Sequence, residues 1–280
     1  MAHPALKQDS VAVVTGGAAG IGLAVAHRFA ALGMAVAIAD VRQDKLDEAA
    51  ADLKSAGARD VLAQRTDVSD RGSLVALEKE VGARFGGADI LVNNAGIQPG
   101  SAMFGASERW QQTLGVNLWG IINGTQVFAP GMIERGRPGA IINTGSKQGI
   151  TTPPGDPAYN VSKSGVKAFT EALAHELRNT PGANLTAHLL IPGFVFTELT
   201  RGDRTEKPAG AWTPDQTADF MIERMNAGDF YILCPDNDVP RELDEKRMAW
   251  AIGDIIENRP ALSRWHPDYA EAFEAFVKSE

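Results

Sequence analysis

The sequence predicts an α/β fold: a doubly wound parallel sheet with helices on both faces. Short apolar, β-branched runs such as residues 11–15 (VAVVT) suit strands that are buried on both faces, as in parallel sheets. These runs alternate with longer amphipathic segments up to about residue 235, as strand–helix–strand units do. No stretch in between resembles a linker. We therefore expect one domain over residues 1–236 and a helical extension of that domain over residues 237–280.

The expected elements follow one another in chain order. They are strand 11–15, helix 23–33, strand 34–40, helix 43–56, a short strand near Val61, helix 70–85, strand 88–93, helix 107–135, strand 139–143, helix 157–179, strand 184–191, a lid at about 194–228, a last strand within 231–236 and a helix near 240–257. Right-handed crossovers place the carboxyl ends of parallel strands at one edge of the sheet. A ligand site is expected at that edge.

A glycine-rich turn, residues 16–22 (GGAAGIG), joins the first strand to the first helix. Glycines let the backbone approach a pyrophosphate closely, and the dipole of the helix favours its negative charge. The second strand ends in Asp40, where the ribose of a dinucleotide would be held. A carboxylate at this point repels a 2′-phosphate, so NAD is expected rather than NADP, although the nearby Arg42 is basic.

Tyr159 and Lys163 are four residues apart in the expected helix 157–179, and Ser146 follows a strand upstream. Positions i and i+4 share one face of a helix, so both side chains can reach one cleft. A nearby cation favours the phenolate, so we expect Lys163 to lower the pKa of Tyr159 and make it a usable acid or base. Ser146 can hold a substrate oxygen beside it. Taken alone, the Tyr–Lys spacing also fits a half-buried tyrosine beside a solvated lysine.

Together these motifs resemble the short-chain dehydrogenase/reductase family. The motifs are TGGAAGIG at 15–22, Asp40, Asp67-Val68, NNAG at 93–96, Asn117, Ser146, Tyr159 with Lys163, and Pro192-Gly193 with Thr197. The similarity covers about residues 8–235. It implies a Rossmann fold, a nicotinamide cofactor and hydride transfer.

The resemblance also implies roles for single residues. Asp67 and Val68 would frame the adenine, and Asn117 would kink a helix and hold a water that relays protons from Lys163. The implied catalytic residues are Asn117, Ser146, Tyr159 and Lys163. The implied cofactor contacts are Gly16, Ala19, Gly20, Ile21, Asp40, Val41, Asp67, Val68, Asn94, Ala95, Gly96, Tyr159, Lys163, Pro192, Gly193, Val195 and Thr197.

Several of these residues also have a simpler structural explanation. Asp67 could cap the helix that starts near residue 70, because Asp is favoured at helix N-termini. Asn93 and Asn94 could only form a turn. Thr197 could cap the following segment ELTR.

The expected activity is that of an NAD-dependent oxidoreductase that interconverts a secondary alcohol and a ketone or aldehyde. Tyr159 would take the proton of the alcohol while a hydride passes from its carbon to the nicotinamide, and Lys163 would bind the nicotinamide ribose. Two alternatives remain: an NADPH-dependent carbonyl reductase, supported by Arg42, and a non-catalytic nucleotide-binding regulator. The complete set of catalytic residues argues against the regulator.

The substrate is the least defined part of this prediction. Apolar side chains in the lid suit a hydrophobic substrate, but they also suit packing on the protein itself. Lys147 or Arg201 could recognise a carboxylate. The candidate substrate contacts are Gln98, Ser146, Gln148, Phe194 and Trp212.

The composition disfavours several other classes of protein. The chain has 27 basic and 35 acidic residues and no basic stripe, so nucleic acid is an unexpected partner. No stretch has the length or apolarity of a membrane span, and no leader is recognised, so a cytoplasmic location is expected. The only cysteine, Cys234, suits a packed thiol, and the histidines are too scattered to predict a metal site.

The extension over residues 237–280 departs from the short-chain pattern, because short members of the family end soon after the last strand. It carries Trp250, Trp265, Tyr269 and Phe273. These side chains could cap the substrate cleft, pack on another subunit or fold back on their own chain. A homo-oligomer, either a dimer or a tetramer, is expected from the resemblance, with the helix 157–179 as a natural contact.

Overall fold

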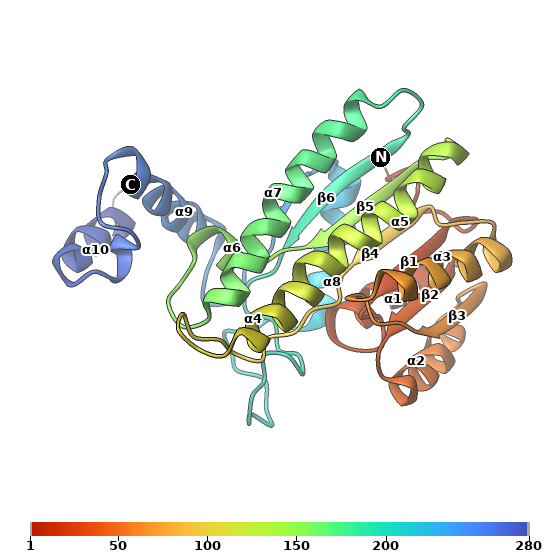
Figure 1. Ribbon diagram of the computed structural model, residues 1–280, viewed down its shortest axis with the longest axis horizontal. Helices are drawn as coiled ribbons and strands as arrows, with labels where there is room; N and C mark the ends of the chain where they lie inside the picture. The colour runs from red at the N-terminus through yellow and green to blue at the C-terminus, as the bar shows by residue number, and fades with distance from the viewer. Residues whose placement is uncertain (1, 279–280) are drawn as a thin grey trace.

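The structure, a computed structural model, describes residues 2–278. In this part of the chain a seven-stranded sheet lies between two layers of helices (Figure 1). The strands are β1 (Val11–Thr15), β2 (Ala35–Asp40), β3 (Asp60–Arg65), β4 (Ile90–Asn93), β5 (Gly139–Thr144), β6 (Leu185–Ile191) and β7 (Tyr231–Leu233). The α-helices are α1 (Gly20–Ala31), α2 (Gln43–Ser55), α3 (Arg71–Phe85), α4 (Ser107–Leu114), α5 (Gly120–Arg135), α6 (Gln148–Thr151), α7 (Pro157–Asn179), α8 (Pro214–Ala227), α9 (Arg241–Ile256) and α10 (Ala270–Lys278).

The strands run in the order β3-β2-β1-β4-β5-β6-β7, and every neighbouring pair is parallel. Val13 in β1 lies between Ala37 of β2 and Leu91 of β4. The chain winds outward in opposite directions from these two central strands, so a crevice opens where β1 and β4 end. The predicted doubly wound Rossmann fold is confirmed.

Alternate residues of the strands point into separate cores on the two faces of the sheet. Val14 and Ile38 pack on the first face with Phe29 of α1, while Val13 packs on the second face with Leu77 of α3. All these side chains are fully buried. This burial on both faces explains the continuous apolar runs in the sequence.

The expected helix 107–135 is interrupted by a π-helical turn at Gly115–Trp119, between α4 and α5. A π-turn widens a helix by one residue and often marks a functional position. Here it contains Asn117, which is fully buried. The prediction that the helix departs from regular geometry at this residue is therefore confirmed.

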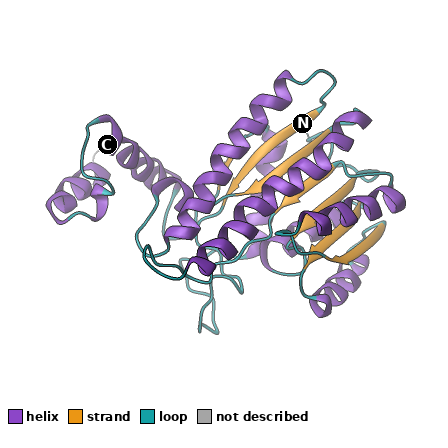
Figure 2. Cartoon of the chain, viewed as in Figure 1, coloured by secondary structure: helices purple, strands orange, loops and turns teal. Residues whose placement is uncertain are grey.

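The C-terminal extension leaves the body beside α6 and projects away from the sheet as an arm of α9, two short 3-10 turns and α10 (Figures 1 and 2). It has its own small core around Trp250, whose ring lies 5.4 Å from Phe273 and 5.3 Å from Phe276. The Trp250 indole also donates a hydrogen bond to Ser263, at 2.8 Å. The arm thus folds largely on itself and meets the body at α6.

Candidate functional site

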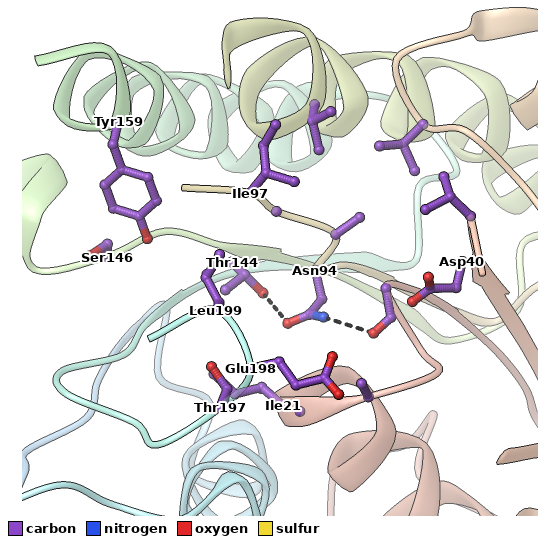
Figure 3. A pocket seen from close by; sticks show the side chains of 18 of the residues that line it. Ile21, Asp40, Asn94, Ile97, Thr144, Ser146, Tyr159, Thr197, Glu198 and Leu199 are labelled. Carbon is purple, nitrogen blue, oxygen red and sulfur yellow. Dashed lines mark hydrogen bonds between the residues drawn. The ribbon is translucent and has the colours of Figure 1, made fainter. Parts of the chain in front are cut away.

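A cavity of about 730 Å³ opens at the carboxyl edge of the sheet, in the crevice between β1 and β4. Every residue that the sequence assigned to cofactor binding, from Gly16 to Thr197, lines this cavity. Tyr159 and Ser146 lie at one end and Asp40 at the other (Figure 3). The strand ends thus bring together motifs that are far apart in the chain.

The glycine turn forms the floor of this cavity with its backbone. Gly16 and Gly20 have φ values of +63° and +55°, a region that other residues enter at a cost. A Cβ on Gly22 would lie 2.1 Å from the Gly16 carbonyl oxygen, so only glycine fits there. The first turn of α1 has neither a side-chain cap nor an acidic residue. Its free N–H groups and dipole therefore suit a pyrophosphate.

Two asparagines beside the turn hold the sheet edge together. Asn94 donates from its side-chain amide to the carbonyls of Thr15 and Gly16, at 3.3 and 3.4 Å. Asn93 is buried and donates to Asn143 on the neighbouring strand, at 2.9 Å. The alternative that both residues only form a turn is therefore wrong.

Asp67 and Val68 lie on the wall of the cavity past the end of β3. Asp67 accepts hydrogen bonds from the backbone and side chain of Ser69, at 2.9 and 2.7 Å. The cap of α3 is instead Asp70, which accepts from the backbone of Gly72 and Ser73. The alternative that Asp67 caps this helix is therefore wrong.

Three charged groups meet at the Asp40 end of the cavity, where the sequence predicts the ribose. Arg42 contacts the Asp40 carboxylate at 3.2 Å and the Glu198 carboxylate at 2.6 Å. Glu198 belongs to the lid and reaches across toward Asp40 (Figure 3). Both acids are paired with Arg42, which raises the pKa of its guanidinium further. The positive charge of Arg42 is thus already offset by two carboxylates.

Thr197 faces the glycine turn from the lid: a Cβ on Gly20 would lie 3.4 Å from its methyl group. No helix begins after it within the described residues, since the next one, α8, starts at Pro214. The segment ELTR forms only a turn, in which the Thr197 carbonyl accepts from the backbone N–H groups of Thr200 and Arg201, at 3.2 and 2.9 Å. The Thr197 hydroxyl meets the hydroxyl of Thr200 instead of a backbone N–H of this segment, so the alternative of a side-chain cap is wrong. Its placement allows it to close the cavity over the pyrophosphate position.

The hydroxyl groups of Tyr159 and Ser146 point toward one another at the other end of the cavity (Figure 3). Tyr159 is only 8% exposed. Burial raises the pKa of Tyr159 to about 12, and the charge of Asp156 adds to the rise, whereas the hydrogen bond with Ser146 acts in the opposite direction. The expectation that Lys163 lowers this pKa is therefore not met here, because desolvation outweighs any stabilisation of the phenolate.

Lys163 lies one turn after Tyr159 and is buried. Its ammonium donates a hydrogen bond to the Thr144 carbonyl, at 2.8 Å, and lies 5.7 Å from the centre of the Tyr159 ring. Burial lowers the pKa of Lys163 to about 8. The ammonium is therefore mostly protonated at neutral pH, and Lys163 contributes this positive charge to the lining of the cavity.

Asn117 does not line the cavity but fixes its wall. The side-chain amide accepts from the backbone N–H of Ile97 and donates to the carbonyl of the same residue, both at 2.8 Å. A weaker bond of 3.4 Å reaches Ser162 on α7. Asn117 thereby connects the π-turn, the NNAG segment and the helix of Tyr159. The expected water relay through this residue stays a prediction.

The predicted substrate contacts separate into two groups. Only Ser146 lines the cavity; Gln98, Gln148, Phe194 and Trp212 do not. Trp212 packs on Phe220 of α8, with ring centres 5.7 Å apart, and exchanges backbone hydrogen bonds with residues 194 and 196. Trp212 is partly buried and packs against the core, because the start of the lid pairs with the later stretch of the lid that carries this residue.

Some lining residues were not predicted. Gln111, Gln112 and Val116 enter the cavity wall from α4 and the π-turn, and Glu198 and Leu199 enter from the lid. Spacing along the chain gives no signal for these side chains, since their position depends on how distant segments pack. Ile97 also lines the cavity, directly after the NNAG motif.

Lys147, next to Ser146, does not face a substrate carboxylate as considered from the sequence. Its ammonium lies 2.6 Å from Asp244 of α9 and 3.3 Å from Asp236, which follows β7. Both carboxylates are buried, and Asp236 also accepts from the backbone N–H of Phe194, at 3.1 Å. This cluster joins the loop of Ser146, the start of the lid and the extension. Burial raises the pKa of Asp244, although the neighbouring Lys147 opposes this rise.

The family profile described as short chain dehydrogenase matches residues 10–208, most of the chain. The chain belongs to the short-chain dehydrogenase family. As such it is an oxidoreductase that acts on CH–OH groups and uses a nicotinamide cofactor. Within residues 2–278 no helix has the length and apolarity to cross a membrane, and no group of three or more His, Cys, Asp or Glu side chains is placed to hold a metal ion.

Two relatives illustrate the range of this dehydrogenase family. A 1-deoxy-11-beta-hydroxypentalenate dehydrogenase of Streptomyces exfoliatus is 32% identical, over 92% of this chain and 94% of the relative. A 3-oxoacyl-(acyl-carrier-protein) reductase of Thermotoga maritima is 34% identical, over 80% of this chain and 85% of the relative. The resemblance to the family is thus confirmed, and the similar proteins include both a dehydrogenase and a reductase.

Two solved structures of similar fold carry different cofactors. A short-chain dehydrogenase from Burkholderia phymatum in complex with NAD has a TM-score of 0.82 and 31% identity, covering 91% of this chain and 96% of its own. An alcohol dehydrogenase from Thermococcus sibiricus complexed with 5-hydroxy-NADP has a TM-score of 0.70 and 28% identity, covering 77% and 90%. A nicotinamide cofactor therefore fits this dehydrogenase.

Proposed function

We propose that this dehydrogenase uses NAD to interconvert a secondary alcohol and the corresponding carbonyl compound, with Tyr159 as the acid/base. The observation that carries the proposal is the pairing of the Tyr159 and Ser146 hydroxyls in a cavity whose far end holds Asp40. These groups match the two ends of a dinucleotide with a substrate beside it. Apolar side chains such as Ile97, Val116 and Leu199 line the same cavity and suit a substrate with an apolar body.

Nicotinamide, when bound, supplies the hydride acceptor or donor. The residues of the chain hold the substrate and move its proton. Ser146 orients the substrate oxygen, and Tyr159 exchanges a proton with it. The nearby ammonium of Lys163 stabilises negative charge as it develops on the tyrosine oxygen. Because burial excludes water from this end, these interactions are stronger than in solvent.

The pKa of Tyr159 predicts how the two directions depend on pH. With a pKa of about 12, the side chain keeps its proton at neutral pH. It can therefore donate a proton to a carbonyl oxygen directly, whereas alcohol oxidation needs the phenolate. Below this pKa the phenolate fraction rises about tenfold per pH unit, so oxidation should accelerate with pH while reduction should not.

The preference for NAD rests on the ribose end. Asp40 and Glu198 both bind Arg42, so a 2′-phosphate would meet two carboxylates and no free cation. Arg42 is also the basis of the second candidate, an NADPH-dependent reductase, since its guanidinium lines the cavity. Titration with NADH and NADPH separates the two, and a preference for NADPH would refute the NAD assignment.

The decisive experiment compares Tyr159→Phe with the native protein. Secondary alcohols, hydroxy acids and aryl alcohols are screened with NAD by absorbance of the reduced cofactor. We expect kcat to fall by about 10²- to 10⁴-fold while the Kd for NADH changes little. Tyr231→Phe is the control, because Tyr231 is half-exposed on β7 and bonds to Glu171. Retained turnover in Tyr159→Phe would sink the acid/base role.

A further inference from the structure

A second cavity, of about 450 Å³, lies between the arm and the body. One wall is formed by α6 and α7, and the other by α9 and the turn Ser263–Trp265. It shares no lining residue with the dinucleotide cavity. Apolar side chains dominate its walls, among them Ile150, Leu262 and Trp265. Such a concave apolar surface with a few polar groups is typical of small-molecule sites.

Two arginines, Arg247 and Arg264, line this cavity. Neither has a carboxylate within ion-pair distance among the described residues, and the buried Nε of Arg247 has no hydrogen-bond partner. Asp244, whose charge interacts with both arginines, is paired with Lys147 at 2.6 Å. The other charged lining residues are already paired, Lys167 with Glu171 and Asp254 with Arg259.

The charges of the two guanidinium groups repel each other, and one of the two groups is held in place by aromatic rings. Burial and the charge of Arg247 both lower the pKa of Arg264. Arg264 is fixed on two aromatic faces, 4.8 Å from the Trp265 ring and 5.1 Å from the Phe273 ring. Pre-positioned guanidinium groups recognise a carboxylate through paired hydrogen bonds. A bound anion would also remove the repulsion between them.

We propose that this cavity binds a small carboxylate with an apolar body, such as an aromatic acid. The carboxylate would pair with Arg247 and Arg264, and the apolar body would rest on Ile150, Leu262 and Trp265. This is a second site, independent of the cofactor and of the proposed reaction. It uses side chains of the extension that the dinucleotide cavity does not need.

The test is calorimetric titration of 2-naphthoate into the full protein saturated with NADH, so that the cofactor part of the first cavity is filled. We expect saturable binding of one ligand per chain. The uncharged amide 2-naphthamide should bind at least about tenfold more weakly, because it lacks the charge-assisted hydrogen bonds. No saturable binding, or equal affinity for the amide, would overturn the proposal. So would assembly of the protein into an oligomer that excludes the ligand.

Substitutions of the two arginines test whether 2-naphthoate binds in the second cavity. Arg247→Gln combined with Arg264→Gln should weaken 2-naphthoate by about tenfold or more and leave the Kd for NADH unchanged. The matched control is Arg241→Gln on the same helix, since Arg241 is exposed and paired with Glu245. Unchanged affinity in the double variant refutes the site. If that variant does not fold, the single variant Arg264→Lys, which keeps the charge but loses the planar fork, should still bind several-fold more weakly.

Discussion

The Rossmann body and the C-terminal arm are ordered by different means. In the body, residues such as Val13, Val14 and Ile38 are completely buried between sheet and helices. In the arm, order depends on a few contacts around Trp250 and on ion pairs such as Arg259 with Asp254. Ile255 and Ile256 of the arm are 77% and 76% exposed. The same residue types therefore contribute to stability very differently in the two regions.

The largest expected effect on stability and NADH binding together separates two glycine substitutions. Gly22→Ala puts a Cβ 2.1 Å from the Gly16 carbonyl oxygen, a backbone atom that cannot move away without breaking the turn. We expect a loss of about 3 kcal/mol in the free energy of unfolding, measured by urea denaturation, together with loss of NADH binding.

Gly253→Ala in α9 is the matched substitution in the arm. The new Cβ would lie 2.4 Å from Nη2 of Arg259, a side-chain atom that can move away only by giving up its hydrogen bond of 2.6 Å to the Trp250 carbonyl, which costs about 1 kcal/mol. Alanine, in contrast, favours the helix by about 1 kcal/mol. We expect a net change within about 1 kcal/mol and normal NADH binding. Equal losses in the two variants would show that the arm is packed as rigidly as the body.

The next effect concerns the connection between the two regions. Asp244→Ala removes one of the two buried carboxylates that pair with the partly buried Lys147 and should cost about 2 kcal/mol of unfolding free energy. The loop of Ser146 should loosen, so kcat for the proposed substrates should fall while NADH affinity holds. The control is Glu245→Ala, one residue along, whose exposed pair with Arg241 should cost no more than about 0.5 kcal/mol. Equal kcat in both variants would mean that the arm does not support the catalytic loop.

A pH titration distinguishes buried charges of the body and the arm. Unfolded lysine binds its proton up to about pH 10.5, whereas Lys163 in the folded chain releases it near pH 8. Between these values the unfolded state binds more protons, so this group makes the folded state more stable as pH rises. From pH 8 to 10, the native protein should gain about 1 to 2 kcal/mol relative to Lys163→Met.

Asp244 has the opposite sign. Its pKa is raised on folding, so the folded state binds more protons in the acid range and this group favours folding as pH falls. Relative to Asp244→Asn, the native protein should therefore gain stability on acidification. Differences that stay constant with pH in urea melts would contradict both assignments.

The smallest expected effect is on the outer face of the arm. Ile256→Ala removes an exposed side chain and should change the free energy of unfolding by less than about 0.5 kcal/mol. Ile142→Ala in β5, which is fully buried, should cost about 2 to 5 kcal/mol. A cost for Ile256→Ala that approaches that of Ile142→Ala would show that another copy of the chain covers this face, as in the expected homo-oligomer.

The sequence predicted the parts of the site that depend on backbone geometry and local spacing. Gly16 and Asp40 lie at strand ends, Gly20 begins the helix that follows the first of these strands, and a parallel sheet fixes where strand ends meet. Tyr159 and Lys163 lie on one helix, whose periodicity fixes their common face. For these residues the local sequence motif is enough to predict where the side chain or backbone lies in the fold.

What the sequence did not predict depends on contacts between distant segments. Glu198 meets Arg42, and Lys147 meets Asp244, only after the lid and the arm have packed. Trp212 is a large aromatic residue of the lid, which suggested a substrate contact, but its ring packs on Phe220. The pKa of Tyr159 also follows from burial, which spacing to Lys163 does not reveal.

The contact of Lys147 with Asp244 also sets an order of events during synthesis. A ribosome completes Ser146 and Lys147 long before α9, and domains begin to fold from the N-terminal side while the chain emerges. Strands β1 to β6 can already be assembled when Lys147 still lacks its second carboxylate. A nascent chain can thus have its sheet in place while the loop beside Ser146 is unfinished. Helix α9, made near the end of synthesis, completes the loop of Ser146, which is encoded near the middle of the chain.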